Sequence, residues 1–344
     1  MGTPIVMSHL MIRYNFVMGE KSMNPKKISC RIVLLLAGFL YILLSSGVHA
    51  ADRVVVVPLG GGRPLKNVVT VAKAGSKFTN PVAAMNSITD ASATNPYLLL
   101  IAPGQYTLTS TLKMREYVDV TGSGENVTLL TGAISGNVFD ENSAIVKGAM
   151  HATLSNLSIK NTVGHQYSFG IHTTGLGVLA RLQQLTISVT GGSTMNAGVL
   201  NSSSSPNMTE VNVAVSGGVN NIGIYNISSS SPYMTGVNAL VSGGGTNRGV
   251  FNYTSSPVMD GVNLYAWGGS GNNYGVYNES GSNSVKIRRS TLSGETKGLA
   301  NSSSADTVIS QSTIINGISG TGVTCPGSDD NLGHLLDATT CSKL

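Results

Sequence analysis

The chain has 344 residues, of which 11% are charged and 6% aromatic, with 42 glycines and a formal net charge of +5. Five of the 21 basic and one of the 16 acidic residues lie in the first fifty positions, which leaves 16 basic and 15 acidic residues beyond them. A segment so close to neutral has no field that would attract nucleic acid, so we expect no nucleic-acid partner.

Residues 1–50 are predicted to be a signal peptide. A hydrophobic run, IVLLLAGFLYILLSSG, follows three basic residues, Lys26, Lys27 and Arg31. It ends in Val-His-Ala, so we expect cleavage after Ala50 and a secreted or periplasmic protein. The run is short for a bilayer span, which makes an uncleaved anchor the weaker alternative, and we expect no span in the mature protein. The sequence from Met23 is already a complete leader, so we interpret Met23 as the true start and residues 1–22 as a non-native N-terminal extension.

The first part of the mature chain is predicted to form an end cap and the first coils of the fold. Asn80 and Pro81 are typical of a helix start, and Val82, Met85 and Ile88 would cover the open end of a core. The segments PYLLLIAPGQYTL and YVDVTGSGENVTLLTG then alternate in hydropathy between glycine-containing turns, which indicates strands.

A repeat occupies the rest of the chain. Glycine followed by an apolar residue recurs at steps of 28, 25, 26, 26 and 23 residues, at Gly170, Gly198, Gly223, Gly249, Gly275 and Gly298. A second register has the same period, beginning at Leu154, Leu182, Met208, Met234, Met259, Ile287 and Ile309. Short alternating runs at this period indicate stacked strands, whereas leucine-rich repeats would need helical returns that the SSSSP and SGG turns forbid. We therefore predict an all-β fold, a right-handed parallel β-helix over residues 51–323.

Asparagine recurs at one position of the repeat, at Asn201, Asn226, Asn252, Asn278 and Asn301. Stacking would place these amides in a hydrogen-bonded ladder from coil to coil. Each is also followed by a serine or threonine two residues later, which is the pattern of a glycan acceptor in a secreted eukaryotic protein. We favour the ladder, because it requires asparagine once in each coil.

The last segment, residues 324–344, is predicted to be an end loop closed by a disulfide between Cys325 and Cys341. In an exported protein a remaining pair of cysteines is most simply a disulfide. The alternatives are two reduced thiols or a zinc site, for which only His334 is available nearby.

The stretch from Val68 to Gly132, with AKAGSKFTNPVAAMNSI, PYLLLIAPGQYTL and VTGSGENVTLLTG, resembles the opening of pectin-lyase-like β-helix proteins, in particular the pectinesterase type. The resemblance implies the β-helix fold, and it covers two or three coils. A pectinesterase-type site would add paired aspartates and glutamines; Gln183-Gln184 is present without the aspartate pair. A polygalacturonase-type site would need Asp-Asp and Gly-His-Gly, but Asp329-Asp330 falls in the end loop and Gly-His-Gly does not occur.

Candidate catalytic residues follow the second register. Glu210, Asp260, Arg288 and Arg289 are predicted to share a face, with Asp260 about 5 Å from Arg288 and about 10 Å from Glu210. In a lyase the acids would bind Ca²⁺ and an arginine would be the base; in a hydrolase two carboxylates would be acid and base. The alternative is an ordinary ion pair between neighbouring coils. His165 and His172 have no third ligand beside them, so we expect no metal site and no cofactor other than Ca²⁺ in a lyase.

Two functions remain, and the scarcity of charge favours the first. One is an exported, non-catalytic protein that binds polysaccharide or a surface glycan along a side lined with serine, threonine and asparagine. Its candidate binding residues are Tyr225, Trp267 and Tyr277. The other is a polysaccharide-degrading lyase or hydrolase. Tyr225, Phe251 and Tyr277 recur at one position of the coil, so a structural stack of rings is also open. The sequence leaves the oligomeric state undetermined.

Overall fold

The computed structural model describes residues 67–344 except positions 138, 163, 178–179, 283 and 303–305. The predicted signal peptide and its cleavage site lie outside the described residues. Within the described part, the helices are too short or too polar to cross a bilayer.

Eighteen strands form one large parallel sheet made of two rows. The first row contains β1 (Asn67–Val71), β2 (Tyr97–Ile101), β5 (Val118–Thr121), β14 (Tyr233–Thr235), β17 (Val258–Asp260), β20 (Val285–Arg288), β23 (Thr307–Ser310) and β26 (Val323–Thr324). The second row contains β3 (Gly104–Leu108), β6 (Thr128–Gly132), β15 (Asn238–Ser242), β18 (Asn263–Trp267), β21 (Thr291–Gly294), β24 (Thr313–Ile315) and β27 (Asp329–Asp330). Three long strands run through both rows: β8 (Thr153–Asn161), β10 (Arg181–Thr190) and β12 (Asn207–Ser216).

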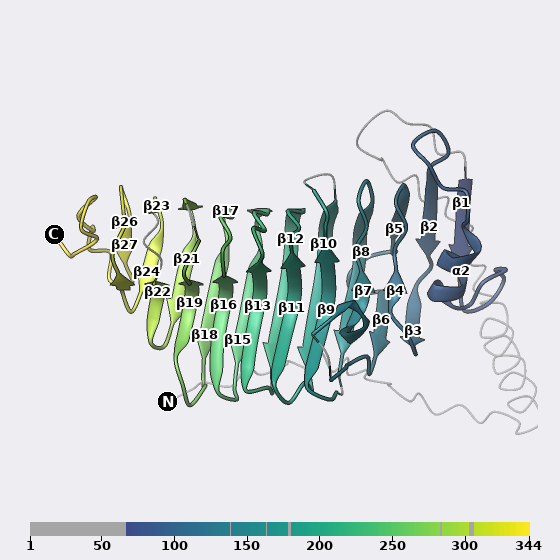
Figure 1. The fold of residues 1–344 in the computed structure, drawn as a ribbon, viewed down its shortest axis with the longest axis horizontal. Helices are drawn as coiled ribbons and strands as arrows, with labels where there is room; N and C mark the ends of the chain where they lie inside the picture. Colours follow the sequence, from purple (N-terminus) through teal and green to yellow (C-terminus); the bar gives the residue numbers. More distant parts are fainter. Residues whose placement is uncertain (1–66, 138, 163, 178–179, 283, 303–305) are drawn as a thin grey trace, which may run out of the picture. The chain divides into compact units, whose positions relative to one another are not determined.

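Nine further strands form a second parallel sheet. They are β4 (Leu112–Lys113), β7 (Ala144–Lys147), β9 (Tyr167–Thr174), β11 (Met195–Ser202), β13 (Asn220–Ile227), β16 (Thr246–Asn252), β19 (Asn273–Asn278), β22 (Lys297–Asn301) and β25 (Ile318–Gly320). Successive coils stack side by side along one axis (Figure 1). The predicted all-β, parallel β-helix is confirmed.

A bend in the left-handed region separates the two rows of the large sheet. Seven equivalent residues have positive φ, between 50° and 62°: Asn156, Gln184, Glu210, Gly236, Gly261, Arg289 and Gln311. Each immediately follows the outward-facing residue that ends the first row. Left-handed backbone is unfavourable for most side chains, so its recurrence in seven coils shows that stacking imposes it.

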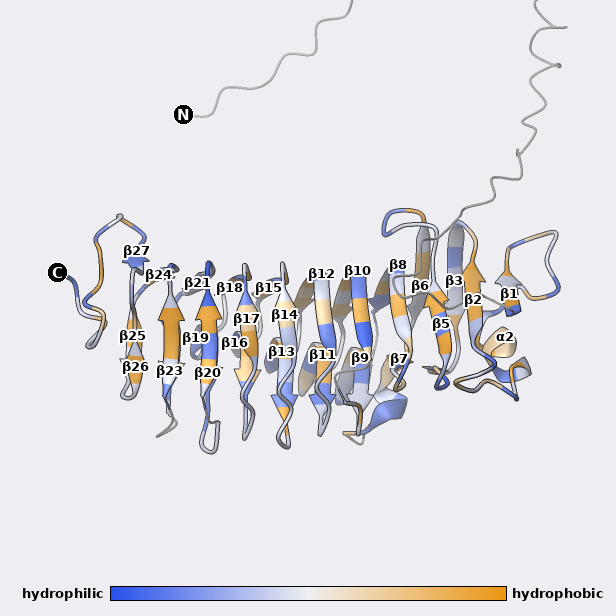
Figure 2. Cartoon of the chain, turned by 90° about the horizontal axis from the view of Figure 1, so that it is seen from above, coloured by the Kyte–Doolittle hydropathy of each residue, from blue (hydrophilic) through white to orange (hydrophobic). Residues whose placement is uncertain are grey.

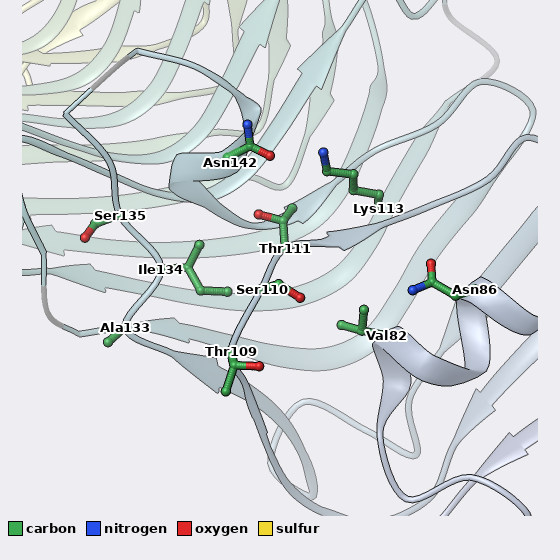
Figure 3. A pocket seen from close by; sticks show the side chains of 10 residues that line it. All are labelled: Val82, Asn86, Thr109, Ser110, Thr111, Lys113, Ala133, Ile134, Ser135 and Asn142. Carbon is green, nitrogen blue, oxygen red and sulfur yellow. The ribbon is translucent and has the colours of Figure 1, made fainter.

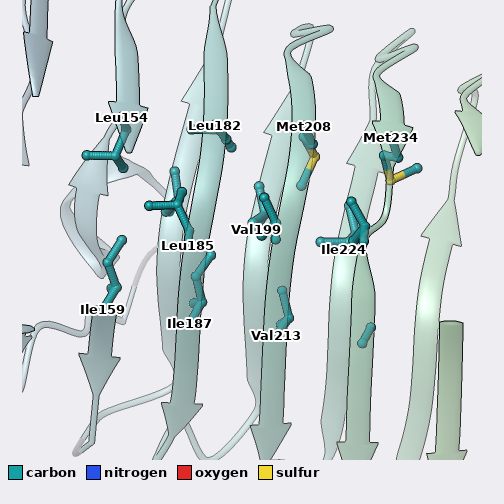
Figure 4. Packing of buried hydrophobic residues seen from close by; sticks show 14 of the residues in the cluster. Leu154, Ile159, Leu182, Leu185, Ile187, Val199, Met208, Val213, Ile224 and Met234 are labelled. Carbon is teal, nitrogen blue, oxygen red and sulfur yellow. The ribbon is translucent and has the colours of Figure 1, made fainter. Parts of the chain in front are cut away.

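The core lies between the sheets and is built from columns of like residues. Leu154, Leu182, Met208 and Met234 stack in register, each at most 2% exposed (Figure 4). Hydrophobic and hydrophilic residues are interspersed along the strands (Figure 2), as expected where one side of a strand is buried and the other is wet. No coil could bury these side chains alone, so the core exists only through stacking.

The repeated glycines do not lie at the corners between strands. They lie inside the strands of the second sheet, and their backbones are not in the left-handed region. A Cβ on Gly223 would lie 2.4 Å from the carbonyl oxygen of Gly249 and 2.7 Å from Cβ of Ala239. The glycines are therefore required by the close approach of neighbouring coils.

The predicted asparagine ladder is seen as a row of side-chain hydrogen bonds. The amide of Asn201 donates to Asn226, that of Asn226 to Asn252, and that of Asn252 to Asn278, each at 2.8 Å. Asn278 then donates to the Thr307 hydroxyl at 3.1 Å, and Thr307 donates to Asn301 at 3.3 Å. All five asparagines are at most 3% exposed, so in the folded chain their side chains are not accessible to a glycan and serve the ladder instead.

A second buried ladder was not predicted from the sequence. The amide of Asn196 donates to Asn221 at 3.1 Å, Asn221 to Asn247 at 3.0 Å, and Asn247 to Asn273 at 2.8 Å. These residues precede the first ladder by five positions in each coil, in the pattern Asn-x-Gly-x-x-Asn. That spacing was the signal that could have revealed them.

The two ends of the solenoid differ. At the first end, helix α2 (Pro81–Ser87) begins at Asn80, whose side chain accepts hydrogen bonds from the amides of Val82 and Ala83. Helix α2 lies beside β1 (Figure 1). Its Met85 is fully buried in the core, and we interpret the helix as the end cover. A 3-10 helix, η1 (Glu141–Ser143), precedes β7.

At the other end, the predicted disulfide joins Cys325 to Cys341, with their Cα atoms 5.3 Å apart. Cys325 is fully buried and belongs to the core, which ties residues 324–344 to the last coil.

Candidate functional site

The bend brings three of the four candidate catalytic residues together. Asp260 pairs in register with Arg288 of the next coil, and Arg289 occupies the bend position beside it. Nε of Arg288 lies 3.0 Å from Oδ2 of Asp260, and Arg289 donates from Nε to Oδ1 at 2.9 Å and from Nη2 to Oδ2. Both carboxylate oxygens are therefore occupied by guanidinium groups.

Glu210 is not part of this cluster. It occupies the bend column with Gly236, Gly261 and Arg289, whereas Asp260 lies one residue earlier, in the column of Thr209 and Thr235. Glu210 lies two coils from Asp260, because Thr209 pairs with Thr235 and Thr235 pairs with Asp260. Arg289 shares the bend column with Glu210 but reaches Asp260 because it lies in the adjacent coil.

The electrostatics of Asp260 suit a structural ion pair. The hydrogen bond from Arg289 is the main reason that the pKa of Asp260 lies below its ordinary value, and both arginine charges act in the same direction. Nη2 of Arg288 also donates to the Tyr233 hydroxyl at 2.9 Å, which holds that side chain in place. Among the described residues there is no group of three acidic, histidine or cysteine side chains that could hold a metal ion.

Replacing Asp260 with asparagine should lower the stability at neutral pH and flatten its acid dependence. Because the folded-state pKa of Asp260 is depressed, its contribution is complete above the unfolded pKa of about 3.9 and is lost as the pH falls through the folded value. Urea denaturation of both proteins from pH 7 to pH 2.5 would measure the difference. Glu210→Gln is the control, since Glu210 is exposed and makes no ion pair in the described part of the chain. If the free energy of unfolding fell equally with decreasing pH in Asp260→Asn and wild type, this account would be contradicted.

Two of the three candidate binding residues, Tyr225 and Tyr277, stack on Phe251, which lies in the coil between them. The rings of Tyr225 and Phe251 lie 4.8 Å apart at an interplanar angle of 5°, and those of Phe251 and Tyr277 lie 5.2 Å apart at 24°. The Arg248 guanidinium lies 4.7 Å from the Phe251 centroid and 5.2 Å from that of Tyr277. Burial raises the pKa of Tyr225 to about 12. Since neighbouring groups occupy the ring faces, this column acts as a structural ladder.

His172 lies in the same outward column of the second sheet, in register with Lys147 and Leu200. It is 6% exposed, and burial lowers its pKa below the ordinary value.

Trp267, the third candidate binding residue, lies on a different face. It ends β18 in the second row, where Tyr265 is the preceding outward residue and Leu240 is the in-register neighbour of Tyr265. Leu240 is 50% exposed and Trp267 is 38% exposed. Three side chains thus present apolar surface to solvent on two adjacent strands.

The face around Trp267 has no charged side chain at any outward position from β10 to β24. We call it the uncharged face, and its residues are Thr186, Ser188, Thr190, Asn212, Ala214, Ser216, Asn238, Leu240, Ser242, Asn263, Tyr265, Trp267, Thr291, Ser293, Thr313 and Ile315. An amide row crosses it, with Asn263 donating to Asn238 and Asn238 to Asn212, both at 2.8 Å. Two acidic side chains in the described part of the chain reach this face. Glu125 accepts a hydrogen bond from Thr186, and Glu295, beside Trp267 in the next coil, accepts one from the Gly268 amide.

The parallel coils, the asparagine ladders and the outward-facing columns define a parallel β-helix protein. The chain is similar in structure to a pectin methylesterase from Erwinia chrysanthemi, with 11% identity, a TM-score of 0.43, and coverage of 81% of this chain and 93% of that one. The carrot pectin methylesterase has 15% identity and a TM-score of 0.47, with coverage of 78% of this chain and 79% of that one. The catalytic domain of a GH87 α-1,3-glucanase has 13% identity and a TM-score of 0.38, with coverage of 80% of this chain and 66% of that one.

No protein-family profile matches the chain, and no curated protein matches it either. The parallel β-helix fold rests on the strand pairings of this chain. A shared fold at such low identity does not imply a shared activity.

Proposed function

We propose that this protein is an exported, non-catalytic polysaccharide-binding β-helix, and that the uncharged face is its binding surface. The observation that carries the proposal is the combination on that face of Tyr265, Trp267 and Leu240 with rows of amides and hydroxyls. Aromatic and aliphatic groups pack against the C–H surfaces of sugar rings, while amides and hydroxyls match sugar hydroxyls. Because the face is uncharged, the expected ligand is a neutral polysaccharide.

The geometry also suits a long, regular ligand. Neighbouring coils repeat the same outward position about every 4.8 Å, so equivalent contacts recur along the axis. Asn212, Asn238 and Asn263 illustrate this repetition, since their side chains hold one another in one orientation across three coils. A rigid, preformed face loses little conformational entropy when it binds.

Affinity electrophoresis with neutral polysaccharides, including cellulose derivatives, xylan, mannan and β-glucan, and with pectate as the anionic comparison tests the proposal. We expect retention by a neutral polymer that does not change with ionic strength, because no charge pair contributes. Changing both Tyr265 and Trp267 to alanine should weaken retention at least about tenfold. Tyr253→Ala is the matched control, since Tyr253 is a 42% exposed aromatic residue away from this face.

The enzymatic alternative is tested in the same samples. Reducing ends and unsaturated products would be followed with and without Ca²⁺, using wild type, Asp260→Ala and Arg288→Ala. Turnover that both substitutions abolish, or salt-sensitive retention on pectate alone, would overturn the proposal. The ion pairs that occupy both oxygens of Asp260 support the expectation of no turnover.

A further inference from the structure

An open cavity of about 510 Å³ lies beside helix α2. Three stretches of the chain line it: helix α2, the segment from the end of β3 to Lys113 of β4, and the segment from the end of β6 to Asn142 of η1. In Figure 3, Ser110 and Thr111 lie between Val82 and Asn86 on one side and Ile134 and Ser135 on the other. We call this cavity the corner pocket.

The lining of the corner pocket is mostly polar and almost without charge. Seven of its residues bear hydrogen-bonding side chains, namely Asn86, Thr109, Ser110, Thr111, Lys113, Ser135 and Asn142, and three are apolar, namely Val82, Ala133 and Ile134. No carboxylate is among them. The single charged group, Lys113, is 3.3 Å from Glu141, which also pairs with Lys147.

Among the described residues, two polar side chains of the pocket are hydrogen-bonded to the protein and three others, all exposed to solvent, are not. The Thr111 hydroxyl donates to the Ala144 carbonyl at 2.8 Å, and the Ser135 hydroxyl accepts from the His165 amide at 3.0 Å. Asn86, Thr109 and Ser110 make no side-chain hydrogen bond to the described part of the chain. Amides and hydroxyls both donate and accept, which is what a ligand with many hydroxyl groups requires.

The pocket lies at the ends of β3 and β6, two strands of the row that farther along the axis forms the uncharged face. The connections that line it follow β3 and β6, and β6 leads through β8 to β10. Three strand spacings separate β3 from β10, which is about 14 Å. Among the outward positions of β3, β6 and β8, Lys160 is the one charged residue, so a ligand on the face meets little charge on its way to the pocket.

From these observations we infer that the corner pocket binds a terminal sugar unit of a neutral polysaccharide, an inference that rests on the proposed function. The volume lies within the range of about 300–1,000 Å³ that small-molecule sites have, which suits one or two sugar rings. Hydroxyls and amides would bind the sugar hydroxyls, while Val82 and Ile134 would pack against the ring. The uncharged face would bind the interior of the chain.

The test compares short and long ligands. Calorimetry with neutral trisaccharides (cellotriose, laminaritriose, mannotriose and maltotriose) measures the pocket, and electrophoretic retention by neutral polymers measures the face. Ser110→Trp should fill the pocket and weaken binding of the trisaccharide at least about tenfold, while retention by the polymer persists. Changing Tyr265 and Trp267 to alanine should weaken retention by the polymer, while binding of the trisaccharide persists.

Ser270→Trp is the matched control, because Ser270 is an exposed serine in the turn after β18. Thr109→Val supplies a second variant that removes one hydroxyl at constant volume, and circular dichroism with thermal melting confirms folding. Polymer retention without trisaccharide binding, or trisaccharide binding unaffected by Ser110→Trp, would overturn the pocket and leave the face intact. Absence of polymer retention would overturn the proposed function, and trisaccharide binding sensitive to Ser110→Trp would then still support the pocket.

Discussion

Replacing Asn226 with alanine should lower the free energy of unfolding by about 2–6 kcal/mol. Asn226 accepts a hydrogen bond from Asn201 and donates one to Asn252, and all three residues are fully buried. The substitution leaves one donor and one acceptor unsatisfied in the interior, each of which costs about 1–3 kcal/mol. Water cannot reach them without opening the coil.

Asn238→Ala is the control for this prediction. Asn238 makes the same two ladder bonds, to Asn212 and from Asn263, but the row lies on the partly exposed uncharged face. Solvent can replace those bonds, so we expect a loss of about 1 kcal/mol or less. Urea denaturation followed by circular dichroism measures both variants. An equal decrease in the free energy of unfolding in the two variants would show that burial of the amides does not determine how much the ladder stabilises the fold.

Gly223→Ala is the second substitution expected to have a large effect. The new methyl group would lie 2.4 Å from the carbonyl oxygen of Gly249 and 2.7 Å from Cβ of Ala239, closer than such atoms approach in proteins. Neither neighbour is the end of a flexible side chain, so relief requires moving one coil relative to the next. We expect a loss of about 3 kcal/mol or more, at the upper end of overpacking effects.

Gly177→Ala provides the matched comparison. A Cβ at Gly177 meets no atom within 4 Å, and its backbone is not in the left-handed region. Its effect should therefore be within about 1 kcal/mol of zero, or slightly stabilising because alanine restricts the unfolded chain. Thermal melting and soluble yield of the two variants decide the matter. A Gly223→Ala protein as stable as Gly177→Ala would refute the explanation given for the repeated glycines.

The candidate site was less predictable than the fold. Asp260 and Arg288 were expected to be neighbours because equivalent positions in successive coils must stack, and they form an ion pair. Glu210 lies two coils from Asp260 and makes no ion pair with the cluster in the described part of the chain. The two tyrosines of the ladder were recognised as equivalent, but whether their ring faces met solvent or each other depended on side-chain packing.

Periodicity alone determined the parallel β-helix and the first asparagine ladder, because a residue repeated once in each coil must meet its equivalents at the strand spacing; composition determined the near neutrality of the chain beyond residue 50. Tertiary structure decided which columns face outward, why glycine recurs inside strands, and how Val82, Ser110 and Ile134 enclose one cavity. Those features depend on bends and connections that do not repeat, so no period in the sequence records them.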